Sequence, residues 1–234
     1  ARGAIAADKP APVPDKQVTL KTTGTLKDVA AELTRQAGFV VDVSAVDDTA
    51  KVNANFNNTP VWAAIEAVAD QANGFVRVSG NTVKFGKRPN GVGAVPSGIA
   101  GPFRVVLKKV VARRDPELAD AEYELHLEVQ WEPRFPVLII DTEPQATATV
   151  GKQQLQADWA SVRVIPSGYS HAAVVKLKNV PREAKQLNDL SCTFRVAAAA
   201  KMLAVEFKDL TSDKPVSQTV DGVKVTLDPM KAGD

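Results

Sequence analysis

The chain has 234 residues, enough for one large domain or two small ones, with hydrophobic and charged fractions of 44% and 24% that are ordinary for a globular protein. Its 29 basic and 27 acidic residues give a net charge of +2, which excludes the strongly basic surface typical of nucleic-acid-binding proteins. No apolar run approaches the roughly 20 residues that a membrane-spanning helix needs. The single cysteine, Cys192, excludes an internal disulfide and a zinc site built on cysteines.

Residues 1–16 are rich in alanine, proline and charge, and their lack of an apolar period predicts an arm outside the folded domains. Small residues at Ala4, Ala6 and Ala7 would suit the end of a secretory signal. The apolar Ile5 and Val13 could contact a neighbouring subunit, or the arm could pack on its own domain. The sequence leaves both alternatives open.

Residues 17–86 contain a helix–strand pattern that occurs twice. After a short strand at 18–20, Thr25 is expected to cap a helix with Asp28 as its capping-box partner, and Gly38 to end it. A strand follows at 39–43. The helix has one apolar face, formed by Leu26, Val29, Ala30, Leu33 and Ala37.

The second copy begins with a strand at 51–56, after which Thr59 is expected to cap a helix, with Pro60 in the first turn and Gly74 at the end. A hairpin at 75–85 completes the module. The predicted order is β-α-β-β-α-β-β, a small sheet with two helices on one face. The apolar face of the second helix consists of Val61, Ala64, Ile65, Val68 and Ala72.

Residues 87–102 include three prolines and no apolar period, which predicts a linker. From residue 103 onward the apolar period changes from 3.6 to 2, most clearly at 122–131, and short alternating runs recur up to 227. The fold class is therefore predicted as α+β: a small βαββαββ domain at 17–86, then an all-β immunoglobulin-like sandwich at 103–234. Further strands are expected at 103–107, 173–177, 190–196, 203–207 and 223–227.

The first module resembles the short N-terminal domain of secretins and TonB-dependent receptors. The resemblance lies in LKDVAAELTRQAGFVV at 26–41 and in TPVWAAIEAV at 59–68, which continues to Gly74 and Phe75. The second module is similar to uncharacterised exported proteins of planctomycetes. The resemblance implies a periplasmic or cell-surface location, and because neither family's barrel domain is present in this sequence, an accessory protein rather than a channel.

The residues that could carry chemistry are few. His126 alternates with Glu124 and Glu128 along one strand face, which allows a surface metal contact but is more typical of a solvated face. His171 begins a strand, and Cys192 has the inward parity of a small buried hydrophobe. No nucleophile elbow, phosphate-binding loop or zinc-protease motif occurs. We expect no enzyme activity, no catalytic or metal-binding residue and no cofactor.

Contact features are better represented. Trp62 lies at the flank of the second apolar helix face and could cover its own core or anchor a partner. Phe135 and Trp159 could form an edge patch, although loop packing explains them equally well. The candidate interface residues are Ile5, Val13, Trp62, Phe135 and Trp159.

The sequence therefore predicts a non-enzymatic structural subunit of a periplasmic or cell-surface assembly, in contact with other subunits as a homo- or hetero-oligomer. The alternative is a soluble module that binds a peptide, glycan or regulator. A hydrolase with an unrecognised site is the least favoured. We expect no nucleic-acid partner and no membrane span.

Overall fold

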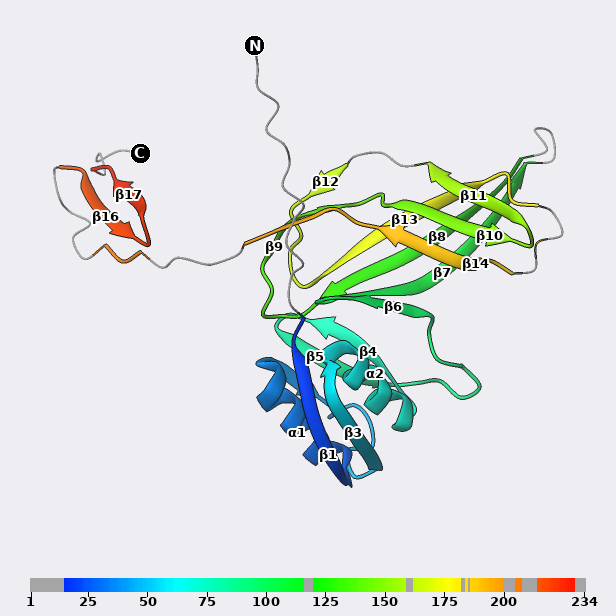
Figure 1. The fold of residues 1–234 in the computed structure, drawn as a ribbon, viewed down its shortest axis with the longest axis horizontal. Helices are drawn as coiled ribbons and strands as arrows, with labels where there is room; N and C mark the ends of the chain where they lie inside the picture. Colours follow the sequence, from blue (N-terminus) through cyan, green and yellow to red (C-terminus); the bar gives the residue numbers. More distant parts are fainter. Residues whose placement is uncertain are drawn as a thin grey trace, which may run out of the picture. The chain divides into compact units, whose positions relative to one another are not determined.

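The computed structural model describes residues 15–115, 120–158, 162–181, 184, 186–199, 205–207 and 214–229. In this part of the chain the fold is mostly β with two helices (Figure 1). No helix among these residues is long and apolar enough to cross a membrane. The chain divides into two compact units, with the boundary after Ala198. The predicted modules on either side of the linker thus belong to one unit, and the chain beyond Ala198 forms another.

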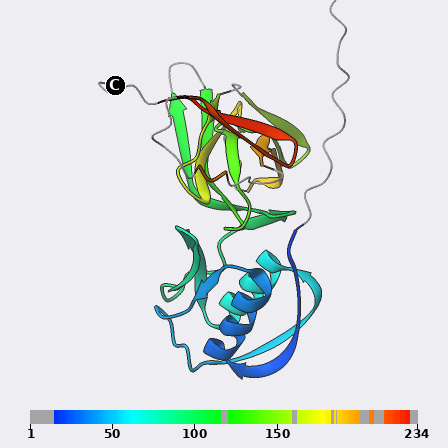
Figure 2. The same cartoon turned by 90° about the vertical axis from the view of Figure 1, so that its left-hand side faces the viewer.

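The first module has the predicted β-α-β-β-α-β-β order, but its strands form two sheets. Strands β1 and β3 pair antiparallel, and the other three strands are ordered β2-β5-β4. Helix α1 contacts β1 and β2, while α2 contacts β3 and β4, so both helices lie between the sheets (Figure 2). The elements are β1 (Gln17–Thr25), α1 (Leu26–Ala37), β2 (Val40–Asp42), β3 (Lys51–Pro60), α2 (Val61–Gln71), β4 (Gly74–Ser79) and β5 (Thr82–Lys87).

The prediction of one sheet with the helices on one face is therefore wrong, and the reason lies in α2. Besides the expected stripe, α2 also buries Trp62 and Ala69, so its apolar surface is too wide for a single sheet to cover. A second sheet on the opposite side removes that surface from water.

Local signals determine both ends of α1. The backbone N–H of Asp28 donates to Thr25 Oγ1 at 3.2 Å, and that of Thr25 to Asp28 Oδ2 at 3.4 Å, which is the predicted capping box. The Thr25 hydroxyl also donates to Asp28 Oδ2, at 2.6 Å, and this bond, followed by that from the Thr25 N–H, lowers the pKa of the Asp28 carboxyl. Gly38 ends the helix in the left-handed region at φ 80°. The predicted apolar face is buried: Leu26, Val29, Ala30, Leu33 and Ala37.

The ends of α2 differ from the prediction. Thr59 lies in β3, and Pro60 occupies the N-cap position without a side-chain hydrogen bond to the helix. The N–H of Val61 donates instead to the carbonyl of Lys16 at 2.8 Å, so a distant backbone group satisfies one of the free helix donors. The chain turns after α2 at Asn73, which has φ 49°, and Gly74 already belongs to β4.

The second module contains a seven-stranded sheet, ordered β14-β10-β11-β13-β8-β7-β6, and a three-stranded sheet, ordered β12-β9-β15. Side chains of both sheets, including Trp131 of β8 and Ile140 of β9, share one core. The strands are β6 (Ser97–Ala100), β7 (Phe103–Asp115), β8 (Asp120–Trp131), β9 (Val137–Asp141), β10 (Gln145–Val150), β11 (Gln153–Asp158), β12 (Arg163–Val164), β13 (Ser170–Lys178), β14 (Asn188–Thr193) and β15 (Val196–Ala198).

The alternating pattern predicted for β8 is confirmed, since Leu125, Leu127, Val129 and Trp131 are buried. The opposite face is less solvated than expected, because Gln130 is also buried. In the inner part of β13 the predicted burial is likewise found, with the core residues Ala173, Val175 and Leu177.

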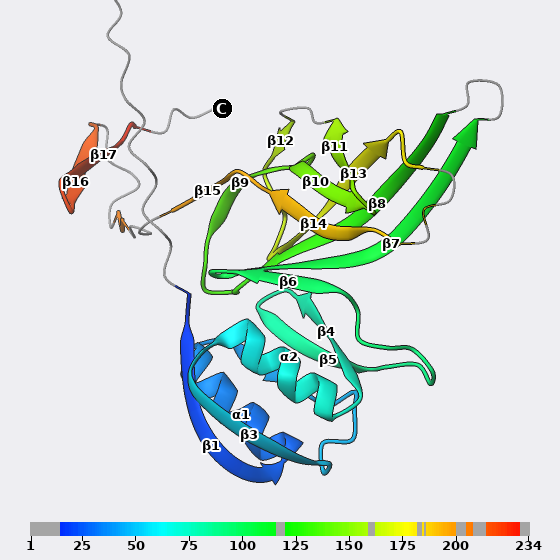
Figure 3. The same cartoon turned by 45° about the vertical axis from the view of Figure 1, so that its right-hand side comes forward.

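The predicted linker is partly a strand. Its residues 97–100 form β6, which pairs antiparallel with β7 from Ser97↔Val106 to Ala100↔Phe103. Gly101, at φ 56°, permits the tight reversal that brings the segment back onto β7. Figure 3 shows β6 joining the seven-stranded sheet beside the first module. Backbone pairing thus overrides the Gly/Pro-rich composition.

The strand predicted at 190–196 is divided between the sheets, because β14 ends at Thr193 and β15 begins at Val196. Residues 205–207 are not in a strand, and Leu203 lies outside the described residues. In the unit after Ala198, β16 (Val216–Val220) and β17 (Val223–Leu227) form a hairpin. Its turn residues Asp221 and Gly222 have φ 50° and 80°, as in a type I′ turn.

Cys192 of β14 packs against the second core, as predicted, and burial raises the pKa of its thiol to about 11. At about pH 8 an ordinary thiol is roughly a quarter thiolate, whereas a pKa of about 11 leaves about one part in a thousand. We therefore expect the native chain to react with a disulfide reagent about a hundredfold more slowly than the chain in concentrated guanidinium. Native and denatured rates within about threefold would contradict this burial.

Candidate functional site

The junction between the two modules is filled by buried side chains rather than by a flexible link. Trp62 is 0% exposed, and its indole N–H donates to the carbonyl of Pro102 at 2.9 Å. Ile99 of β6 packs against the core of the first module. Trp62 also belongs to the core of the first module, which agrees with the alternative that it covers its own core and not with exposure to a partner protein.

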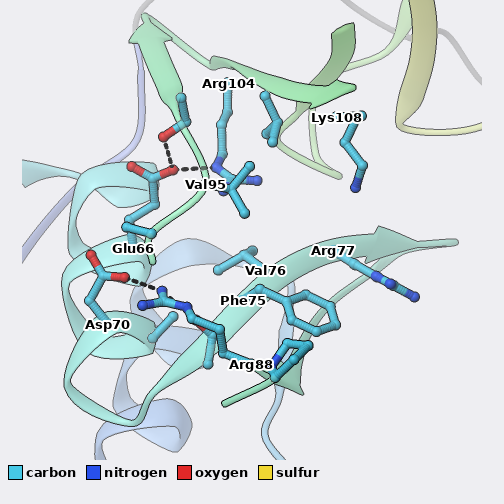
Figure 4. A pocket seen from close by; sticks show the side chains of 15 residues that line it. Glu66, Asp70, Phe75, Val76, Arg77, Arg88, Val95, Arg104 and Lys108 are labelled. Carbon is cyan, nitrogen blue, oxygen red and sulfur yellow. Dashed lines mark hydrogen bonds and ion pairs between the residues drawn. The ribbon is translucent and has the colours of Figure 1, made fainter. Parts of the chain in front are cut away.

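A buried ion pair lies beside this anchor. Arg104 of β7, 5% exposed, donates from Nε to Glu66 Oε1 of α2 at 2.5 Å and from Nη1 to Gln130 Oε1 of β8 at 2.7 Å. Ser97 Oγ also donates to Glu66 Oε1, at 2.6 Å (Figure 4). A buried guanidinium needs acceptors from several directions, and here they come from both modules.

A third contact joins the start of β1 to the second module. The backbone N–H of Lys16 donates to Glu132 Oε1 at 3.0 Å, and Arg134 Nε lies 2.5 Å from Glu132 Oε2. Glu132 is 0% exposed, and this burial raises the pKa of its carboxyl, although the hydrogen bond from Lys16 and the charge of Arg134 oppose the rise. Since the Lys16 carbonyl also accepts from Val61, one residue links α2 to Glu132.

A cleft of about 290 Å³ opens next to the ion pair. Strand β4 contributes Phe75, Val76 and Arg77, and β7 contributes Val106 and Lys108 (Figure 4). Two of the cations in the wall are paired with acids of α2: Arg104 with Glu66, and Arg88 with Asp70. Arg88 also donates to the carbonyl of Gly74 at 2.7 Å, which ties the end of β5 to β4.

Phe75 is held in the cleft wall by its neighbour across the strands. It pairs with Gly86 of β5, where a Cβ atom would overlap the Phe75 ring. The guanidinium of Arg77 lies over the Phe75 ring, 4.5 Å from the ring centroid, in a cation–π contact. The absence of a side chain at Gly86 thus lets an aromatic ring and a cation share one wall.

The predicted interface residues do not come together here. Ile5, Val13 and Trp159 lie outside the described residues, as does the predicted arm apart from Asp15 and Lys16. Phe135 is half-buried and meets Phe103 edge-on, with 5.7 Å between ring centroids. It packs against the second core, which agrees with the loop-packing alternative rather than with an edge patch.

The histidines are placed on β8 and β13. His126 Nε2 lies 3.7 Å from Glu124 Oε2, while Glu128 pairs with Lys108 at 3.1 Å. His171 is half-buried, and burial lowers the pKa of its imidazole. Among the described residues, no group of three or more histidine, cysteine or acidic side chains is arranged to hold a metal ion.

Exposed apolar residues in β9 and on either side of β12 were not predicted from the sequence. Four consecutive apolar residues, 137–140, form most of β9, but only Val137 and Ile140 face the core. The run of four was the available signal, since a strand with one solvated face should alternate. The exposed residues are Leu138 (50%), Ile139 (37%), Val162 (48%) and Ile165 (83%).

Comparison with known proteins gives no match: no family model, no curated protein and no solved structure is similar to this chain. Any assignment of function therefore depends on the residues and contacts described above.

Breaking the buried ion pair should destabilise the chain strongly. Arg104→Ala leaves Glu66 and Gln130 without their cation, and we expect the free energy of unfolding to fall by about 2–4 kcal/mol. The matched control is Arg35→Ala, because Arg35 pairs with Glu32 on the exposed side of α1, where a pair contributes less than about 1 kcal/mol. Guanidinium denaturation followed by circular dichroism measures both changes. Equal losses in the two variants would contradict a role for Arg104 at the junction.

Proposed function

We propose that this chain is a non-enzymatic structural subunit of a periplasmic or cell-surface assembly and acts through contacts with other protein subunits. The observation that carries the proposal is a set of exposed apolar residues: Leu138 and Ile139 in β9, and Val162 and Ile165 on either side of β12. Exposed apolar residues that lie close together are typical of protein interaction sites, and β9 and β12 are paired strands of one sheet. Ile165 is 83% exposed, more than any other large apolar residue that is described.

The fold supports the same proposal. The βαββαββ order and the capped α1 are consistent with a domain like those at the N-termini of secretins and TonB-dependent receptors. Two sheets around one core are consistent with an immunoglobulin-like sandwich in the second module. We infer export and a homo- or hetero-oligomer from these resemblances. The N-terminal arm would add a clasp between subunits, by addition to a sheet edge.

The alternative function is a soluble module that binds a peptide, glycan or regulator. The cleft beside Arg104 favours it, because the cleft combines an aromatic ring with several charged groups. A hydrolase is the least favoured, since the described residues around Cys192 bury the thiol and raise its pKa, which is unfavourable for a nucleophile.

Light scattering over a concentration series tests the assembly function. We expect a mass of at least twice the 24.9 kDa chain, and we expect Ile165→Asp to shift the population to monomer, because a carboxylate in an apolar contact loses its hydration. Val92→Asp is the matched control, since Val92 is 49% exposed in the loop before β6. Deleting residues 1–14 shows whether the arm contributes to the contact.

A chain that stays monomeric at every concentration would contradict the assembly function and favour the ligand-binding alternative. Equal effects of Ile165→Asp and Val92→Asp on the measured mass would show that Ile165 does not lie in the contact surface.

A further inference from the structure

We propose that the cleft between β4 and β7 binds an acidic, extended segment of another protein, which adds as a strand to the free edge of β4. This site is separate from the exposed apolar residues of β9 and beside β12, so the inference goes beyond the assembly function; it rests on the ligand-binding alternative and names its partner class. Its support comes from the charges of the cleft, its apolar wall and the position of β4 in its sheet.

The charges in the cleft wall do not balance. Four cationic side chains and two acidic ones line it, which leaves two excess positive charges. The two acids, Glu66 and Asp70, are occupied by Arg104 and Arg88. The excess cations are therefore Arg77, which is exposed and for which no ion pair is found among the described residues, and Lys108.

Lys108 is only weakly neutralised. Its Nζ lies 3.1 Å from Glu128 Oε2, but its side chain is 44% exposed, and an exposed ion pair is weak because water and salt screen it. Arg77 lies on β4 and Lys108 on β7, the strands on the two sides of the cleft (Figure 4). An acidic side chain entering the cleft would meet one cation on each side.

The rest of the lining is apolar. Phe75 is held against Gly86, Val95 is 37% exposed, and Val76 and Val106 are buried in the wall. A single inorganic anion is normally held by converging hydrogen-bond donors, whereas here the cations are separated by an aromatic ring and aliphatic side chains. A ligand that alternates acidic and apolar groups matches this arrangement better.

Strand β4 offers the backbone for such a ligand. It lies at the end of the β2-β5-β4 order, so β5 is the one strand paired with it in the described part of the chain. An unpaired strand edge is a template for an added strand. Arg88 already takes the carbonyl of Gly74, and every second residue of β4 pairs its backbone with β5, which leaves the outward backbone groups of the alternate residues for pairing. In an added strand, every second side chain faces the same way, about 6.5–7 Å apart.

Fluorescence anisotropy with the full chain and a short labelled peptide of alternating glutamate and valine tests the proposal. We expect saturable binding that weakens about tenfold in Arg77→Gln and about tenfold in Lys108→Gln, since each removes one charge-assisted contact. Lys21→Gln, which removes one exposed charge on β1 outside the cleft, should leave the dissociation constant unchanged. All three residues are exposed, and thermal unfolding verifies that the variants fold.

Two further peptides separate charge from strand addition. A glutamine–valine peptide keeps the shape without the charge, and an N-methylated glutamate–valine peptide keeps the charge but cannot donate backbone hydrogen bonds; both should bind at least about tenfold more weakly. Equal binding of either peptide would overturn the proposal, as would the lack of saturable binding. Displacement by citrate or inorganic phosphate at the same concentration as unlabelled peptide would identify a small-anion site instead. None of these outcomes depends on the mass measured by light scattering, so the two proposals fail independently.

Discussion

The buried guanidinium of Arg104 is the constraint on which the arrangement of the first compact unit depends. A cation removed from water must be matched by acceptors, and its acceptors are Glu66 on α2 and Gln130 on β8. Those acceptors belong to different modules, so the charge is satisfied only while the modules are in contact. Trp62 adds a buried indole ring at the junction, and its N–H donates to the Pro102 carbonyl. The cleft exists because these contacts hold β4 near β7.

The same constraint explains which parts of the fold could be predicted. Helix α1 follows from local rules, because Thr25, Asp28 and Gly38 supply both ends within its own sequence. The strand β8 follows from its alternation. By contrast, the first N–H of α2, that of Val61, donates to the carbonyl of Lys16. No local sequence pattern predicts a hydrogen bond between residues so far apart in the chain.

The candidate sites were predicted less well, for a related reason. The alternation at 122–131 places Gln130 on a solvated face, and Glu132 is expected in the turn that follows, but both side chains are buried. Composition suggested a linker where residues 97–100 pair with β7. Trp62, at the flank of its helix face, was one of five candidate contact residues, and its contact lies within the chain. Local sequence patterns reveal residues that pack within one element. The junction and the cleft beside it depend on contacts between residues far apart in the sequence.

The most direct test of this account is whether the two modules move as one body. Residual dipolar couplings of backbone N–H groups, measured for residues 17–87 and for the strands of 103–198, report the orientation of each module. The account predicts that one alignment tensor fits both sets, because the Arg104 and Trp62 contacts fix the junction. Two different tensors in the unmodified chain would show independent modules and contradict the account.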